Sequence, residues 1–176
     1  MKKILTLFAV IGLIAFSSCE GPEGPPGVPG VPGESVAAEV IDVNNVSFDA
    51  NGNGGVRSFG FTLFPGDVVL AYRADGVSAG RTVWVQIPES HYYNDGTLFF
   101  TYKFNFTLVD YELYLQGFEL NEVPADLRTG QKFRIVVVPG NDPVNTNKSV
   151  NKPDYSDYYA VIKKYNIDDS NVKQVN

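Results

Sequence analysis

Residues 97–107 read TLFFTYKFNFT, and nearly every second side chain in this stretch is hydrophobic. An alternation with period two over this length predicts a β-strand that presents one face to a hydrophobic core. The opposite face carries threonine, lysine and asparagine, with Phe99 as the exception. The residues expected on the buried face are Leu98, Phe100, Tyr102, Phe104 and Phe106.

Short hydrophobic runs continue on both sides of this stretch, and Gly, Asn, Asp or Pro interrupts them about every 8–12 residues. Such spacing is typical of a β-sandwich or a β-barrel. We therefore predict an all-β domain over residues 36–166, a single immunoglobulin-like or jelly-roll-like β-sandwich with about seven strands. The other strands are expected at 38–48, 56–63, 67–74, 81–87, 110–118 and 131–138.

Two local patterns refine this prediction. Residues 135–138 read IVVV without a polar residue, which indicates a central strand buried on both faces. Turns are expected at Pro65-Gly66 and at Asn94-Asp95-Gly96, where the second is typical of a hairpin.

The C-terminal part predicts a short helix over residues 154–165, with Asp154 as its N-cap and Lys163 and Lys164 at its end. One face of this helix is expected to dock on the sandwich. The last ten residues, 167–176, are expected to be frayed. The docking face would carry Tyr155, Tyr158, Tyr159 and Ile162.

The N-terminus has the pattern of a signal peptide over residues 1–18. Two lysines precede an apolar run at 4–16, which is too short to span a membrane as a helix. The ending Ser17-Ser18-Cys19 resembles a bacterial lipobox, with Phe16 in place of the usual leucine. This resemblance implies cleavage before Cys19, diacylglycerol on its sulfur and an acyl chain on its amine. The alternative is an ordinary signal peptide with a cysteine nearby.

Composition excludes several classes of function. The 176 residues carry 14 basic and 20 acidic side chains, a formal charge of −6, and loss of Lys2 and Lys3 with the signal peptide would leave 12 against 20, or −8. Such a chain is a poor partner for nucleic acid. Its single Cys excludes an intrachain disulfide and a cysteine zinc site, and its single His excludes a site with several histidines. We expect no cofactor beyond the lipid on Cys19.

Residues 19–35 contain the lipidated Cys and a collagen-like tract with Gly at every third position from Gly21 to Gly33. Only Gly fits at the axis of a collagen triple helix, so the tract could trimerise the protein. We favour a polyproline II spacer on a monomer, because a tract this short buries little surface. Such a spacer would reach about 45 Å.

A lipobox, a tract reading CEGPEGPPG and one all-β domain together resemble the collagen-like lipoproteins of Bacteroidota-type bacteria. The resemblance covers nearly the whole chain and implies a lipid anchor in the outer membrane, without implying catalytic residues. In such bacteria acidic residues directly after the lipidated Cys often accompany export to the cell surface, so the resemblance, with Glu20 and Glu23 at these positions, implies the cell surface over the periplasmic face. Stretches that look like recurrent segments of that family are 66–70, 95–98, 133–137 and 147–150.

Two polar stretches are candidates for a metal site or an active site. Asp49, Asn51 and Asn53 match the opening of an EF-hand loop, but Gly60 stands where a bidentate carboxylate is needed. We favour a flexible hairpin loop, with weak calcium binding by loop oxygens left open. His91 lies beside Ser90, but neighbouring strand residues point apart, so a polar aromatic loop is favoured over an active site.

Aromatic residues outside the clearest core positions are the better sign of function. Trp84, Tyr92 and Tyr93 could stack on a glycan or anchor a protein ligand, and the alternative is that they complete the core or cover a sheet edge. The sequence thus favours a membrane-anchored, non-catalytic lipoprotein of the cell envelope that presents a binding, adhesion or structural module. The alternatives are a polysaccharide-acting envelope enzyme and a homotrimer joined through the Gly-X-Y tract.

Overall fold

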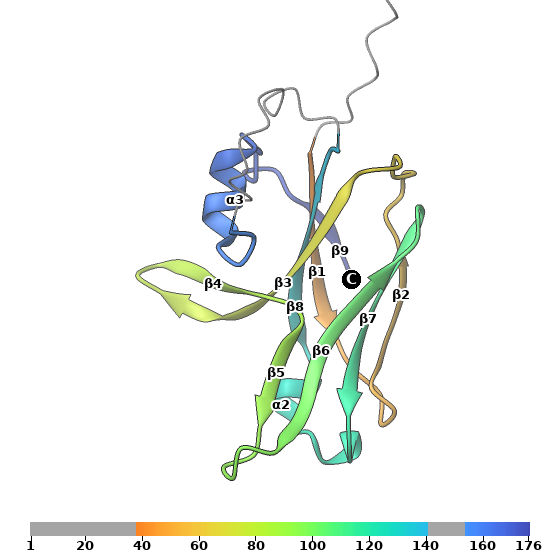
Figure 1. Cartoon of the computed structure of the whole chain (residues 1–176), viewed down its shortest axis with the longest axis vertical. Coiled ribbons are helices and arrows are strands. Elements are labelled where there is room, and N and C mark those ends of the chain that lie inside the picture. The colour runs from red at the N-terminus through yellow and green to blue at the C-terminus, as the bar shows by residue number, and fades with distance from the viewer. Residues whose placement is uncertain (1–37, 141–153) are drawn as a thin grey trace, which may run out of the picture. The chain divides into compact units, whose positions relative to one another are not determined.

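A computed structural model describes residues 38–140 and 154–176 of the chain, and in this part nine strands form two sheets. The all-β sandwich is therefore confirmed, with more strands than the seven expected (Figure 1). The predicted signal peptide at 1–18, Cys19, the spacer at 19–35 and the segment 147–150 lie outside the described residues.

The larger sheet has the order β4-β3-β8-β1-β9, and the smaller sheet has the order β2-β7-β6-β5. All neighbouring strands pair antiparallel except β1 and β9. The strands of the larger sheet are β1 (Glu39–Val46), β3 (Val68–Ser78), β4 (Arg81–Gln86), β8 (Gln131–Val138) and β9 (Lys173–Val175). Those of the smaller sheet are β2 (Asn53–Ser58), β5 (Glu89–Tyr92), β6 (Leu98–Phe106) and β7 (Asp110–Gly117).

The β8 strand lies in the middle of the larger sheet and confirms the prediction from its IVVV run. Ile135 and Val137 face the other sheet, and Val136 and Val138 face away from it into a second hydrophobic cluster. All four are almost completely buried. The five-stranded sheet therefore has a hydrophobic layer on each of its faces.

The β6 strand matches the alternation predicted for residues 97–107. Phe100 and Tyr102 are fully buried in the main core between the sheets, where Tyr102 packs its ring 5.9 Å from that of Phe133. Leu98 and Phe106, expected on the buried face, are exposed. They sit at the two ends of β6, where the strand runs into the connections to β5 and β7.

Three strand boundaries differ from those expected. The second strand spans Asn53–Ser58 in place of 56–63, and it pairs with β7. Within it, Gly54 passes so close to Phe48 and the Leu113 carbonyl that a Cβ would lie 2.6 Å from each. Gly54 and Gly55, expected in the loop that begins at Asp49, therefore belong to β2. The β3 strand continues to Ser78. His91 and Tyr92, expected in a polar aromatic loop, belong to β5 because residues 89–92 pair with β6.

The C-terminal segment contains helix α3 (Tyr158–Lys164), which is shorter than predicted. Its N-cap is Asp157, which accepts from the Ala160 backbone N–H at 3.1 Å, whereas Asp154 accepts from Ser156 in the preceding turn. The tail is not frayed, because β9 pairs in parallel with β1. Two further short helices, η1 (Leu120–Glu122) and α2 (Ala125–Arg128), connect β7 to β8.

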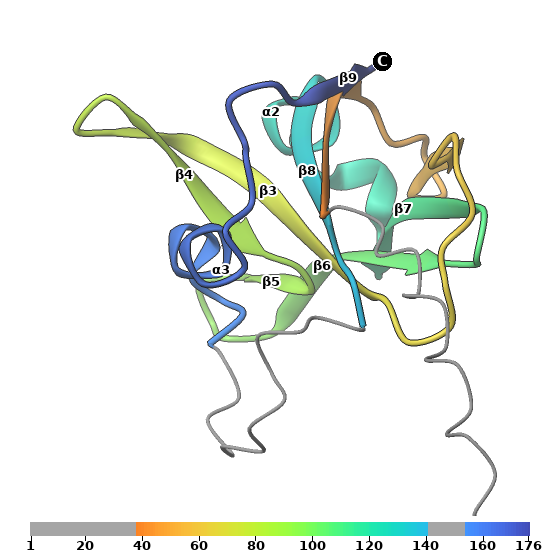
Figure 2. The same cartoon turned by 90° about the horizontal axis from the view of Figure 1, so that it is seen from above.

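Helix α3 lies beside β3 and β4, against the outer face of the five-stranded sheet (Figures 1 and 2). Tyr158 and Val161 enter the second hydrophobic cluster, so the predicted docking on the sandwich is confirmed. Tyr155 and Ile162 pack at the edge of this cluster, and Tyr159 remains 42% exposed. The β3–β4 hairpin projects from the sandwich next to the helix (Figure 1).

Gly117→Ala tests how closely β6 and β7 pack. A Cβ at Gly117 would overlap the Phe99 carbonyl oxygen and lie 2.8 Å from the Phe100 Cα, and backbone atoms cannot yield easily. We expect a loss of about 2–3 kcal/mol in the free energy of unfolding, measured by urea titration. Gly66→Ala is the control: its φ of 106° costs about 1 kcal/mol, and no atom lies near its Cβ. An equal or smaller loss for Gly117→Ala would contradict this packing.

Candidate functional site

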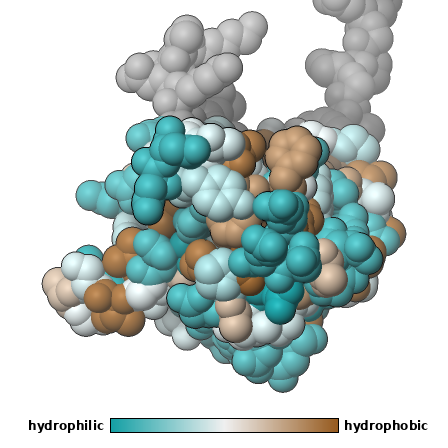
Figure 3. Space-filling model, turned by 90° about the horizontal axis from the view of Figure 1, so that it is seen from below, coloured by the Kyte–Doolittle hydropathy of each residue, from teal (hydrophilic) through white to brown (hydrophobic). Residues whose placement is uncertain are grey.

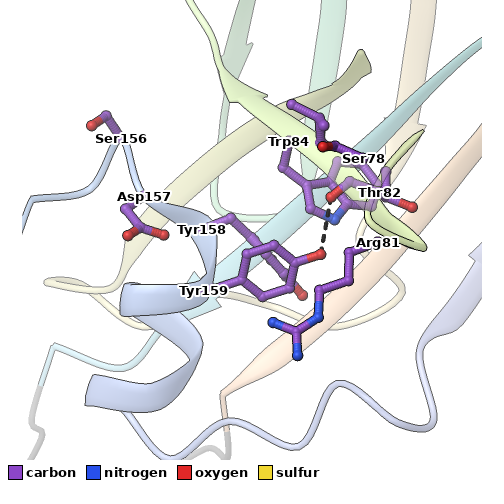
Figure 4. Close-up of a pocket in the computed structure, with 9 residues that line it drawn as sticks. Ser78, Arg81, Thr82, Trp84, Ser156, Asp157, Tyr158 and Tyr159 are labelled. Atoms are coloured by element: carbon purple, nitrogen blue, oxygen red, sulfur yellow. Dashed lines mark hydrogen bonds between the residues drawn. The ribbon is translucent and has the colours of Figure 1, made fainter. Parts of the chain in front are cut away.

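A hollow of about 290 Å³ lies between the β3–β4 hairpin and the start of α3 (Figure 4). Residues almost 80 positions apart in the sequence form its walls, because α3 packs beside β4. The lining combines aromatic rings, hydroxyl groups and one charge of each sign. The residues are Ser78, Arg81, Thr82, Val83, Trp84, Ser156, Asp157, Tyr158 and Tyr159.

Trp84 is a buried aromatic residue in the wall of this hollow. Its ring centroid lies 5.6 Å from that of Tyr158, and the Arg134 guanidinium lies 4.5 Å from the centroid. Trp84 is only 9% exposed, yet its indole N–H makes no hydrogen bond to any residue within 38–140 or 154–176. In Figure 4 the indole nitrogen points toward the hollow, on the side of Arg81 and the Tyr159 hydroxyl. The hollow therefore exposes an unpartnered donor on a buried side chain.

Tyr159 links the helix to the hairpin. Its hydroxyl donates a 2.9 Å hydrogen bond to the Thr82 carbonyl oxygen, and the Arg81 guanidinium carbon lies 5.9 Å from its ring centroid. Part of the ring faces solvent. The half-exposed ring and the neighbouring cation together form the outer wall of the hollow.

A buried polar network fixes α3 on the sheet. Arg134 on β8 donates to both carboxylate oxygens of Asp42 on β1, at 2.6 and 3.0 Å, and to the Tyr158 hydroxyl at 2.6 Å. Tyr158 in turn donates to Asp169 at 2.7 Å, and Lys132 pairs with Asp42 at 2.9 Å. The network holds Tyr158, and with it the helix, in one position over Trp84.

Burial and charge act in opposite directions on this network. Burial by itself raises the pKa of Asp42, but the hydrogen bonds and charges of Arg134 and Lys132 outweigh it and hold this pKa below its ordinary value. Burial is also the main reason that the pKa of Tyr158 is raised. Asp42 is therefore charged and Tyr158 neutral at physiological pH.

A second hollow, of about 470 Å³, lies on the outer face of the four-stranded sheet. Phe118, directly after β7, borders it and is 80% exposed. Tyr92 on β5 is exposed and pairs with Leu98 of β6, so Tyr92, Leu98 and Phe118 form a row of exposed hydrophobic residues. In a view toward the β5–β6 turn, hydrophobic residues form separate groups among hydrophilic ones (Figure 3). The lining residues are Leu98, Thr101, Gln116, Gly117 and Phe118.

The three aromatic residues proposed from the sequence do not form one site. Trp84 lies on the five-stranded sheet, whereas Tyr92 and Tyr93 belong to the end of the four-stranded sheet. Tyr93 packs on Phe99 at 4.4 Å between ring centroids, beside the Asn94-Asp95-Gly96 turn, which forms the predicted hairpin. Only Trp84 of the three lines the hollow beside α3.

His91 belongs to a cluster on the inner side of β5, as part of a strand and not of the loop expected there. Its Nε2 lies 3.0 Å from a Glu89 carboxylate oxygen, and its ring stacks on Phe100 at 4.6 Å. The buried Arg73 guanidinium donates to both Glu89 oxygens and to Asp75, each at 2.7 Å. Among residues 38–140 and 154–176 this is the one pairing of imidazole and carboxylate, and its carboxylate is already paired with Arg73.

Ser90 points to the other side of the sheet from His91. Its hydroxyl lies 3.0 Å from that of Thr101 on β6. The strand geometry thus separates these two neighbours, as expected from the sequence.

The Asp49 loop uses its carboxylate internally. Asp49 accepts hydrogen bonds from the backbone N–H groups of Asn51 and Asn53, each at 2.8 Å, and from the Asn53 side chain at 2.9 Å. These bonds lower the pKa of Asp49, the Asn53 side chain contributing most. Asn53 itself begins β2. Across residues 38–140 and 154–176, no cluster of three or more His, Cys, Asp or Glu side chains could hold a metal ion.

Comparisons with protein-family models, with curated proteins and with solved structures find no match for this chain. Among the helices of the described part, none is long and apolar enough to cross a membrane. The resemblance of the chain to collagen-like lipoproteins therefore stays a prediction from its sequence.

Sequence reasoning missed Arg81 and Tyr159 as site residues. Tyr159 was assigned to the docking face of the helix because it follows the spacing of that face, and Arg81 occurs in no recognisable pattern. A helix that starts at Tyr158 with Tyr158 buried turns Tyr159 toward the hairpin. The buried stripe of α3 is centred on Tyr158 and Val161, and Tyr159 lies about 100° around the helix from Tyr158, on the side of the hairpin.

Asp42→Asn tests the network under α3. A carboxyl group whose pKa is lowered in the folded state stabilises the fold fully above its unfolded-state value, here 3.8, and this stability is lost as the pH falls through the lower folded-state pKa. We expect Asp42→Asn to cost about 2–4 kcal/mol at neutral pH, since Arg134 loses its charged partner. The variant should lose less further stability than the wild type in acid.

Urea unfolding of both proteins between pH 2 and pH 7 gives this comparison. Glu112→Gln, a change at a half-buried position on the other sheet, is the control and should follow the wild-type curve. Parallel pH curves for the wild type and Asp42→Asn would argue against a charged Asp42 in the fold.

Proposed function

We propose that this protein is a membrane-anchored, non-catalytic lipoprotein of the cell envelope whose β-sandwich acts as a binding module. The hollow between the β3–β4 hairpin and α3 is its binding site. The observation that supports this role best is the indole N–H of the buried Trp84, which has no hydrogen-bond partner in the described part of the chain and points toward the hollow. Buried tryptophan N–H groups ordinarily have a hydrogen-bond partner, so an acceptor on a ligand would complete the site.

The chemistry of the hollow fits a glycan or protein ligand. Ring faces offer apolar contact area with little loss of side-chain entropy, and the hydroxyl groups of Ser78 and Thr82 add polar contacts. Binding sites of this kind are concave, mainly apolar and carry a few convergent polar groups. A binding role needs none of the residues in the hollow to exchange a proton or act as a nucleophile.

The anchor and the location rest on the sequence. Lipid chains on Cys19 would hold the protein in the outer membrane, and the spacer at 19–35 would lift the sandwich away from the headgroups. We place the module at the cell surface, as a monomer. A trimer joined through the Gly-X-Y tract remains the alternative assembly, and light scattering of the full-length protein in detergent distinguishes the two masses.

A polysaccharide-acting enzyme is the second candidate, and the His91–Glu89 pair is the observation that favours it. Both oxygens of Glu89 accept from Arg73, which suits a structural carboxylate better than a proton donor. Release of reducing ends from a polysaccharide, abolished by Glu89→Gln, would establish this alternative.

Cys19→Ala tests the anchor. In a bacterial host the wild-type protein should be recovered from the membrane fraction, and mass spectrometry should find an N-terminal Cys19 with diacylglycerol and an amide-linked acyl chain. Cys19→Ala should lose both the modification and the cleavage before residue 19. A mature N-terminus at another residue, or an unmodified Cys19 in the wild type, would overturn the proposal.

Protease treatment of intact cells tests the location. A protein on the cell surface is degraded without permeabilising the cells, whereas a periplasmic protein is degraded only after permeabilisation. Survival of the protein in intact cells would place the module on the periplasmic face.

A further inference from the structure

We infer that the hollow beside α3 binds a carboxylate-bearing sugar residue of an acidic polysaccharide. The carboxylate of this residue lies at Arg81 and the Trp84 N–H, and the hydroxyl groups of its ring face Asp157. The inference rests on the binding role proposed above and names its ligand. It follows from the positions of three polar groups around one aromatic wall.

The donors converge on one side of the hollow. In Figure 4 the Arg81 guanidinium and the Trp84 indole nitrogen lie on the side of the Tyr159 hydroxyl. Arg81 contacts the Tyr159 ring but forms no ion pair with an acidic residue in the described part of the chain. A cation and a neutral donor on one side of the hollow suit a carboxylate.

The acceptor of the hollow lies on the opposite side. Asp157 caps α3 through Oδ1, and Figure 4 places its carboxylate beside Ser156, away from Arg81. An anionic group is therefore repelled from this side, while sugar hydroxyl groups can donate to it. The separation of the two charges orients a ligand that has a carboxylate at one end and hydroxyl groups at the other.

The wall and the size of the hollow favour a sugar ring. The half-exposed Tyr159 ring provides a flat apolar surface, on which the C–H face of a pyranose can pack. A volume of about 290 Å³ is at the lower end for ligand pockets, which suits one residue of a chain whose neighbours extend into solvent.

The chain has a formal charge of −6, or −8 without the signal peptide, and this charge repels an acidic polymer as a whole. Recognition therefore depends on Arg81, and the affinity should be modest and should fall with added salt because the contact is exposed. The dependence of affinity on salt therefore distinguishes a ligand that carries a carboxylate from a neutral ligand.

The experiment uses the single tryptophan of the chain as its probe. The full-length lipidated protein in detergent micelles is titrated with a short oligogalacturonate, and in parallel with the same oligosaccharide after reduction of its carboxyl groups to alcohols. We expect the oligogalacturonate to change Trp84 fluorescence with saturation, and the reduced form to bind at least about tenfold more weakly. Equal affinity for both would overturn the carboxylate assignment and leave the binding role standing.

Two variants locate the contact, with affinities measured by calorimetry. Arg81→Gln should weaken binding of oligogalacturonate about tenfold to a hundredfold and leave binding of the reduced oligosaccharide unchanged. Trp84→Phe keeps a ring but removes the N–H, and should weaken binding of the oligogalacturonate as well. Lys103→Gln removes a positive charge on the other sheet and is the matched control, with wild-type affinity expected.

The outcomes separate this inference from the proposed function. If Arg81→Gln binds oligogalacturonate like the wild type, the carboxylate does not lie at Arg81 and the inference fails. If no acidic oligosaccharide binds but a neutral oligosaccharide changes Trp84 fluorescence, the inference fails and the binding site stands. If acidic, neutral and peptide ligands all leave fluorescence and heat unchanged, both fail.

Discussion

The burial of β8 on both faces is the constraint on which the rest of this structure depends. A strand that reads Ile135-Val136-Val137-Val138 must exclude water on two sides, and a sheet has only one inner face in a simple two-layer sandwich. The four-stranded sheet covers Ile135 and Val137, and α3 covers Val136 and Val138. The C-terminal segment is therefore part of the fold, and its return to the sheet ends in the parallel pairing of β9 with β1.

The covering helix is positioned by polar groups as well as by apolar contact. Apolar packing alone would permit α3 to slide over the valines, since hydrophobic attraction has little directionality. The hydrogen bonds of Arg134 to Asp42 and Tyr158 are directional and lie under the helix, so they select one placement. That placement puts Tyr159 against the β3–β4 hairpin and creates the hollow beside Trp84.

The two outer faces of the sandwich consequently differ. On the five-stranded sheet, α3 leaves one hollow with aromatic walls and a charge at each side. On the four-stranded sheet, no described element covers the outer face, and the row formed by Tyr92, Leu98 and Phe118 meets solvent.

The sequence by itself determined the elements whose signals are local. The alternation at 97–107, the IVVV run and the turn residues at 94–96 specify β6, β8 and the β5–β6 hairpin through side-chain period and backbone geometry, which depend on near neighbours only. The sequences of β5 and β9 carry no such signal. Each of these strands forms because a neighbouring strand offers backbone N–H and C=O groups for hydrogen bonding. The site cannot be predicted from local patterns, because Arg81 and Trp84 lie near Tyr159 only when α3 is packed on the outer face of the five-stranded sheet. Only the tertiary structure decided which aromatic rings lie in the core and which line the hollow, because burial depends on how the layers pack and not on the spacing of residues along the chain.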